Sequence, residues 1–193
     1  MNFRFLVHSV KNIILNPMKE WEAVINENKP VKYINRNLLL PLIIITAFSA
    51  FLGSYLFANT ELLKGFSVLT GVKYFILICL VICGTAFILK EIANLFNPGM
   101  DFGMSFKIIA YSSVPFLICQ IVSRIFESFI FINVLALFGL YIFWTGIEKM
   151  LNPSEKNKLL LMIAATLTFI ALFFASDWLL TLILDKLYFA FFA

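Results

Sequence analysis

Five stretches of the chain, each between 16 and 21 residues long, contain no charged residue, and they limit what the chain can fold into. A helix of about 20 apolar residues spans the hydrocarbon core of a bilayer, and a shorter stretch can span it when flanking lysine stems reach toward the headgroups. The sequence therefore predicts an all-α, polytopic membrane protein, a bundle of five transmembrane helices. With their flanks, the predicted spans cover about residues 38–58, 72–90, 106–124, 128–147 and 159–177.

The composition agrees with this fold class and excludes others. Hydrophobic residues make up 62% of the chain and charged residues 13%, whereas soluble domains are roughly half apolar and a quarter charged. Five spans leave little chain for a soluble domain, so we divide it into an interfacial segment, residues 1–36, and a membrane domain, residues 37–193. The net charge of +4 comes without a basic cluster interleaved with aromatic residues. We therefore expect the lipid bilayer, and no nucleic acid, as a partner.

Lysine and arginine residues are unevenly distributed between the two sides of the predicted bundle. Six lie before the first span, two at the connection of the second and third spans, and three at the connection of the fourth and fifth. Eleven of the 15 basic residues are therefore on one side. Because cytoplasmic loops carry the basic excess, we expect the N-terminus in the cytosol and, with five spans, the C-terminus outside.

The first residues have the pattern of an amphipathic helix that lies in the membrane interface. Apolar residues recur at helical spacing, and basic and polar residues fall opposite them. The apolar set is Phe3, Leu6, Val7, Val10, Ile13 and Ile14, and the polar set is Arg4, His8, Lys11 and Asn12. We expect Arg4 and Lys11 to face the headgroups.

A second short helix is predicted to begin at Pro17, because Asn16 can cap it and proline suits the first helical position. Trp21 lies on its apolar face and is suited to the headgroup region. Two interpretations of Trp21 stay open here: contact with lipid, or docking against the spans of the same chain.

Catalytic and metal-binding signatures are absent from the sequence. The chain has one histidine, His8, on the polar side of the first helix, and its three cysteines lie in apolar stretches, where packing is their ordinary role. No spacing typical of a zinc site, a nucleophile elbow or a phosphate-binding loop occurs. We therefore predict a protein that is not an enzyme and that needs no cofactor or metal.

A set of polar residues falls at the predicted cytosolic ends of the second, third and fourth spans, and it is the candidate functional site. Ionisable groups close to membrane depth are costly and often mark function. The alternative is that they are ordinary interfacial anchors and salt bridges. The residues are Lys90, Glu91, Asn94, Asn97, Asp101, Lys107, Tyr111, Glu148 and Lys149. Ser112 and Pro115 join the candidates, because a proline inside the third span removes a helical hydrogen bond and marks a possible break.

Small residues inside the spans indicate where helices approach each other closely. Gly53 lies in the first span, Gly84 in the second, and Gly139 and Gly146 in the fourth. Such positions allow close backbone contact between membrane helices. They are typical of a packed bundle.

The end of the chain allows two interpretations. Asp177, Asp185 and Lys186 interrupt an apolar run that continues to residue 193. Either the fifth helix is long and tilted, or a separate short helix lies in the outer interface after Asp177. We favour the separate helix.

Three stretches carry a resemblance to a known family. They are residues 16–21 (NPMKEW), residues 106–115 (FKIIAYSSVP) and residues 140–146 (LYIFWTG). In this order, and with five spans, the chain resembles the Yip-one domain family of multi-pass membrane proteins, in particular its short bacterial members. The resemblance implies a five-helix bundle with a cytosolic N-terminal segment in the bacterial inner (cytoplasmic) membrane. Eukaryotic relatives work in vesicle traffic and contact prenylated Rab-type GTPases.

Two functions stay open on these observations. The first is a non-enzymatic scaffold that recruits protein partners at the cytosolic face or organises the membrane. The second is a small transporter or channel in which Pro115 breaks the third helix beside Tyr111 and Ser112. The midpoints of the predicted spans contain no ionisable residue, which favours the first.

Overall fold

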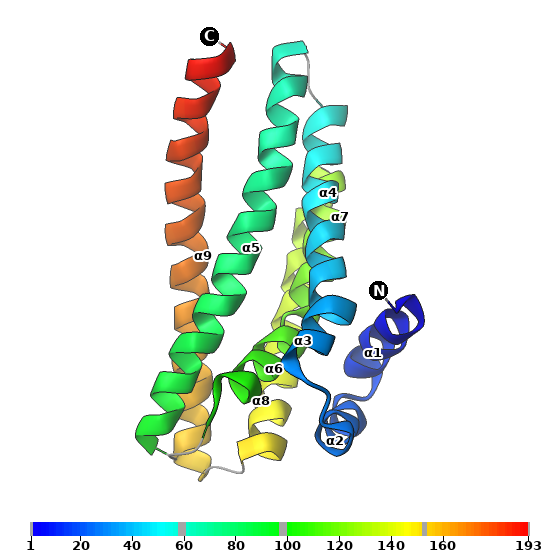
Figure 1. Cartoon of the computed structure of the whole chain (residues 1–193), viewed down its shortest axis with the longest axis vertical. Coiled ribbons are helices and arrows are strands. Elements are labelled where there is room, and N and C mark those ends of the chain that lie inside the picture. Colours follow the sequence, from blue (N-terminus) through cyan, green and yellow to red (C-terminus); the bar gives the residue numbers. More distant parts are fainter. Residues whose placement is uncertain (1, 58–60, 97–99, 152–153, 193) are drawn as a thin grey trace.

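The computed structural model describes residues 2–57, 61–96, 100–151 and 154–192, and these residues form helices without a strand among them (Figure 1). The all-α prediction is confirmed. The elements are α1 (Phe3–Leu15), α2 (Pro17–Glu27), α3 (Val31–Ile34), a π-helix η1 (Asn35–Leu39), α4 (Leu40–Leu56), α5 (Glu61–Phe96), α6 (Phe102–Ser112), α7 (Val114–Ile125), a 3-10 helix η2 (Glu127–Leu137), α8 (Phe138–Leu151) and α9 (Glu155–Phe192).

Four helical stretches are long and apolar enough to cross a bilayer: Val31–Leu56, Phe66–Leu95, Ser128–Leu151 and Lys156–Leu187. The pair α6 and α7 passes the same test but is bent by 43° at its junction, and it makes a fifth span when counted as one. The chain is therefore a polytopic membrane protein. Exposed apolar side chains on these stretches face the surrounding lipid.

The connections alternate between the two ends of the bundle. In Figure 1, α4 rises, α5 descends, α7 rises, α8 descends and α9 rises. One end, which we call the basic end, carries α1, α2, the lower parts of α5, α8 and α9, and α6. The pair α1 and α2, which we call the N-terminal layer, lies beside the bundle at this end.

The lengths of α5 and α9 differ from the predicted spans. Their 36 and 38 residues give about 54 and 57 Å at 1.5 Å per residue, well beyond a hydrocarbon core of about 30 Å. The separate helix that we favoured after Asp177 is wrong, because α9 continues without a break to Phe192. The physical reason is that Asp177 has a cationic partner inside the bundle, Lys73, so its charge does not end the helix.

The first half of the predicted fourth span is also not an α-helix. Residues Glu127–Leu137 form a 3-10 helix, with non-helical dihedral angles at Phe129. The side-chain amide of Asn133 donates to the carbonyl of Ile130, 3.0 Å away. Asn133 thereby bonds the backbone locally, and 3-10 segments of this length are uncommon.

The packed core lies among η1, α4, α5, α6, α7 and α8, and buried residues of α1 and α2 belong to the same cluster. Its fully buried side chains include Leu38, Ile82, Ile108, Leu117 and Ile142, which come from five elements. In contrast, only 11% of the apolar window of α9 is buried. Helix α9 packs mainly along α5 and leaves its other faces to lipid.

Candidate functional site

The third span is broken where Ser113 separates α6 from α7. Pro115 has no N–H, so the carbonyl of Tyr111 loses its ordinary helical donor. Ser113 holds the junction, because its hydroxyl and its backbone N–H donate to the carbonyl of Ile109, at 2.5 and 2.9 Å. The break predicted at Pro115 therefore exists as a bent junction with local hydrogen bonds.

A cavity of about 270 Å³ lies beside this junction. Its lining is almost entirely apolar and comes from α5, α6, α7, η2, α8 and α9. Two lining residues, Thr85 and Ser112, carry buried hydroxyl oxygens that have no hydrogen-bond partner among the described residues. No acidic or basic side chain among the described residues lines it. The cavity suits an apolar molecule rather than an ion.

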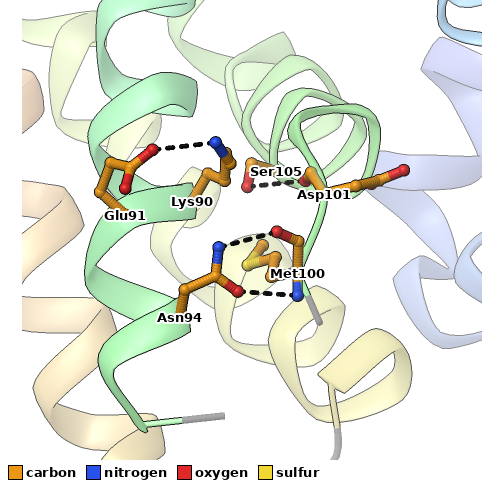
Figure 2. Close-up of polar contacts among 6 residues, drawn as sticks. All are labelled: Lys90, Glu91, Asn94, Met100, Asp101 and Ser105. Carbon is orange, nitrogen blue, oxygen red and sulfur yellow. Dashed lines mark hydrogen bonds and ion pairs between the residues drawn. The ribbon is translucent and has the colours of Figure 1, made fainter. Parts of the chain in front are cut away.

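At the basic end, the side chain of Asn94 on α5 holds the chain segment that leads into α6. Its amide nitrogen donates to the carbonyl of Met100 at 3.0 Å, and its oxygen accepts from the N–H of Met100 at 2.9 Å. Figure 2 shows this two-bond contact. Asn94 therefore satisfies both backbone groups of one residue, as a neighbouring strand would.

Asp101 begins α6 directly after this contact. Its carboxylate accepts from the N–H of Met104 at 2.7 Å. Its carbonyl accepts from the hydroxyl of Ser105 at 3.3 Å, as Figure 2 shows. A carboxylate at this position satisfies a free helical donor and complements the helix dipole. On α5, Lys90 pairs with its neighbour Glu91 at 2.9 Å. Asn97 lies outside the described residues.

Trp21 docks the N-terminal layer onto the bundle. Its side chain is fully buried, and its indole N–H donates to the carbonyl of Ile142 on α8, 3.1 Å away. A Cβ added to Gly146 would come within 2.6 Å of the indole, so the glycine makes room for the ring. The Tyr111 ring lies 5.5 Å from it, between centroids. Of the two interpretations of Trp21, lipid contact and docking against the spans, the structure shows docking.

Two polar contacts reinforce this docking. The ammonium of Lys107 on α6 donates to the side-chain oxygen of Asn28 at 3.2 Å, and Lys149 on α8 pairs with Glu22 at 2.8 Å. Asn28 ends α2 with a φ of 36°, a left-handed conformation that asparagine tolerates. The hydrogen bond from Lys149, and then its charge, lower the pKa of Glu22 below its ordinary value of 4.5.

Glu148 belongs to a third contact, between α8 and the start of α9. Its carboxylate pairs with Lys158 at 2.6 Å. The Lys158 side chain is buried, and its ammonium lies 3.9 Å from the centroid of the Trp144 ring. A buried ammonium needs such a charge partner, and the ring face adds attraction.

The structure therefore divides the predicted polar set among three separate places. Asn94 and Asp101 shape the α5–α6 connection, with the Lys90–Glu91 pair one turn before Asn94 on α5; Lys107, Tyr111 and Lys149 receive the N-terminal layer, and Glu148 joins α8 to α9. Ser112 and Pro115 lie at the bent junction. Arg4 and Lys11 lie exposed on α1.

Sequence reasoning missed an ion pair farther along α5. Lys73 pairs with Asp177 on α9 at 2.6 Å and donates to the hydroxyl of Thr181 at 2.7 Å. Two residues before Lys73, Gly71 packs against Ala47 and Phe51 of α4. The pair therefore lies alongside the membrane-spanning part of α4 and not beyond its end. The signal in the sequence for this pair is that Lys73 and Asp177 carry opposite charges and each lies in an apolar stretch.

A second polar group lies near this pair. The guanidinium of Arg124 on α7 lies 4.3 Å from the centroid of the Tyr74 ring, and its Nε donates to the side-chain oxygen of Gln120 at 3.0 Å. Gln120 in turn donates to Asn133 of η2 at 3.4 Å. These contacts link α5, α7 and η2 through polar side chains within the bundle.

Comparison with known proteins identifies one family. A family model described as the Yip1 domain matches residues 11–176 of the chain. The match begins near the end of α1 and ends in α9, so it includes all of α2 and the predicted spans up to residue 176. No curated protein and no solved structure matches the chain.

Proposed function

The chain belongs to the Yip1 domain family, and from this membership and the docked N-terminal layer we propose that it is a non-enzymatic scaffold. In this proposal the scaffold recruits protein partners at its cytosolic face or organises the surrounding bilayer. Its character as an integral membrane protein is the established part, because its apolar helices and its family agree on it. The role and the orientation are the proposed parts.

The observation that carries the proposal is the docking of Trp21. A fully buried indole, seated over Gly146 and bonded to α8, holds the N-terminal layer at one position on the bundle. The same layer exposes Phe3 and Val7, at 65% and 51% of their surface. A fixed layer with an exposed apolar edge suits the binding of a partner or of lipid.

The proposed location is the bacterial inner (cytoplasmic) membrane, with the basic end in the cytosol. The distribution of basic residues supports this orientation, since eleven of 15 belong to the connections at the basic end. In this orientation α1 begins on the cytosolic side and α9 ends on the other side.

We propose that the protein is not an enzyme, because its polar side chains are occupied by contacts that hold the fold together. Asn94 and Asp101 bond backbone groups, and Lys107, Lys149 and Glu148 each hold another element in place. Side chains with these partners stabilise the fold. A catalytic group would instead have to face a bound substrate.

Photo-crosslinking from two matched positions tests the proposal. Val7 on α1 and Val72 on α5 are exposed to almost the same extent, 51% and 49%. If the scaffold recruits partners, a photoreactive residue at Val7 should give discrete protein adducts in cells, whereas the same residue at Val72 should react with lipid. If the scaffold instead organises the bilayer, the chain should remodel vesicles, and this remodelling should depend on α1. Trp21→Ala should abolish the effect at Val7 by releasing the layer.

The scaffold proposal fails if Val7 and Val72 give the same products and if removal of residues 2–27 leaves vesicle shape unchanged. A folded bundle after this removal, shown by an unchanged elution volume in detergent, is the control.

The second candidate is a small transporter or channel, and the bent junction with its adjacent cavity favours it. The apolar lining indicates an apolar or weakly polar solute. Flux through reconstituted vesicles that falls with Pro115→Ala, but not with Pro41→Ala in α4, would support it. Absence of flux for such solutes would count against it.

A further inference from the structure

An open pocket of about 420 Å³ lies where the start of α1 meets α3 and η1. It is separate from the cavity at the bent junction and from the contacts of the N-terminal layer with α6 and α8. Its lining residues are Asn2, Pro30, Lys32, Tyr33, Arg36 and Asn37.

Hydrogen bonds between its walls hold the pocket in shape. The backbone N–H of Asn2 donates to the side-chain oxygen of Asn37 at 2.9 Å, and the amide nitrogen of Asn37 donates to the carbonyl of Tyr33 at 3.0 Å. Phe5 and Tyr33 contact each other edge to face, with 5.2 Å between their centroids. The pocket is therefore formed before any ligand arrives.

The pocket carries two cations without a protein partner. Lys32 and Arg36 are exposed, lie four residues apart, and form no hydrogen bond or ion pair with another residue that the structure describes. Like charges at this spacing repel each other. Lys29, three residues before Lys32, has its own carboxylate, Glu27, at 2.6 Å. An anion between Lys32 and Arg36 would remove the repulsion.

The position along the first span places this pair at the level of the lipid headgroups. Residues Leu38 to Leu56 form 19 residues of the span, about 28 Å of helix, which matches the hydrocarbon core. Arg36 precedes Leu38 by two residues and Lys32 by six, so both lie within about 10 Å of the hydrocarbon boundary. Phe3, which follows the pocket residue Asn2 in the sequence, is exposed.

We propose that Lys32 and Arg36 form a binding site for the phosphate of an anionic phospholipid. Arginine can bind a phosphate with two parallel hydrogen bonds, and lysine adds a mobile charge beside it. Because Asn2 caps the start of α1 and Asn37 belongs to η1, a headgroup bound here contacts both the start of the N-terminal layer and the first span. The proposal needs only that the chain spans the bilayer, and it does not depend on partner recruitment.

Lipid binding to the purified full chain in detergent tests the proposal. The probes are a phosphatidylglycerol, a phosphatidylcholine with the same acyl chains, and sodium phosphate, and native mass spectrometry reads the bound lipid. The wild type should prefer phosphatidylglycerol. Lys32→Gln with Arg36→Gln should weaken its binding by about 30-fold, which corresponds to about 1 kcal/mol for each charge.

Two matched variants separate this site from general electrostatics and from misfolding. Lys19→Gln with Lys156→Gln also removes two positive charges, but from other exposed positions at the basic end. This variant should keep the preference for phosphatidylglycerol. Lys32→Arg with Arg36→Lys keeps both charges and should also keep most of it.

The proposal is overturned if the double glutamine variant retains the preference, or if the Lys19 and Lys156 variant loses it equally. It is also overturned if sodium phosphate at millimolar concentration displaces phosphatidylglycerol, because the site would then bind free phosphate.

Discussion

The ammonium of Lys73 on α5 lies 2.6 Å from a carboxylate oxygen of Asp177 on α9. Helix α9 is otherwise little buried, and its packing against the bundle depends mainly on α5. The hydroxyl of Thr181, one turn along α9, accepts a hydrogen bond from the same ammonium. This three-residue contact is the polar link that sets the position of α9 along α5.

Asp177→Asn should lower the stability of the protein in detergent by about 2 kcal/mol. Loss of one member of a buried ion pair leaves the other charge without compensation, at about 3–5 kcal/mol when fully buried, and the side chains here are 13% and 36% exposed. Thermal unfolding measures the effect. Asp185→Asn, an exposed change on the same helix, should change stability by less than about 0.5 kcal/mol, and equal effects would refute the assignment.

Trp21→Ala should release the N-terminal layer while the spans stay folded. Removal of a buried tryptophan costs about 3–5 kcal/mol, and the docking of α2 depends on this side chain. Limited proteolysis should cut the chain before residue 30 much faster in this variant. Trp178→Ala, at a position that is 67% exposed, is the matched control. Unchanged proteolysis in Trp21→Ala would contradict the docking role.

Acid should weaken the same docking through Glu22. Because its pKa is lowered in the folded protein, the Glu22–Lys149 contact contributes fully above the ordinary value of 4.5 and is lost as the pH falls through the lower folded value. Proteolysis of the N-terminal layer should therefore speed up below pH 4.5. Glu22→Gln should remove part of this acid dependence, and an identical pH profile in both proteins would show that the contact contributes nothing.

Gly53→Ala should destabilise the bundle, whereas Gly84→Ala should not. A Cβ at position 53 would clash with the backbone carbonyl of Arg124, which cannot move away, but a Cβ at position 84 meets the flexible end of Leu172 at 2.9 Å. Overpacking against backbone costs about 1–3 kcal/mol, while alanine gains up to about 1 kcal/mol of helix propensity over glycine. Thermal unfolding of both variants should therefore differ in sign, and equal shifts would contradict the close approach of α4 and α7.

Hydropathy could locate the spans, because insertion into lipid depends on the local content of apolar residues. The sequence also indicated close approaches at Gly53, Gly139 and Gly146, and in the structure these face the carbonyl of Arg124, the carbonyl of Ser112 and the ring of Trp21. Local rules of packing and capping were sufficient for these features.

Contacts between distant parts of the chain could not be predicted in the same way. Trp21 and Ile142 are 121 residues apart, and neither neighbourhood contains a signal for the other. The prediction that the fifth helix ends at Asp177 was wrong, because the charge of Asp177 was taken as the end of the span. Whether a charge ends a helix depends on a partner elsewhere, and Lys73 supplies it for Asp177.

The π-helix at Asn35–Leu39 has a consequence for every residue before it. Each residue in an α-helix turns the chain by about 100°, and a π turn accommodates one residue more than an α turn. The π turn therefore absorbs one extra residue, and a regular α-helix over the same residues would rotate α3 by about that angle around the axis of the first span. Lys32 would then point away from the start of α1, although the span itself would keep all of its contacts with α5 and α7.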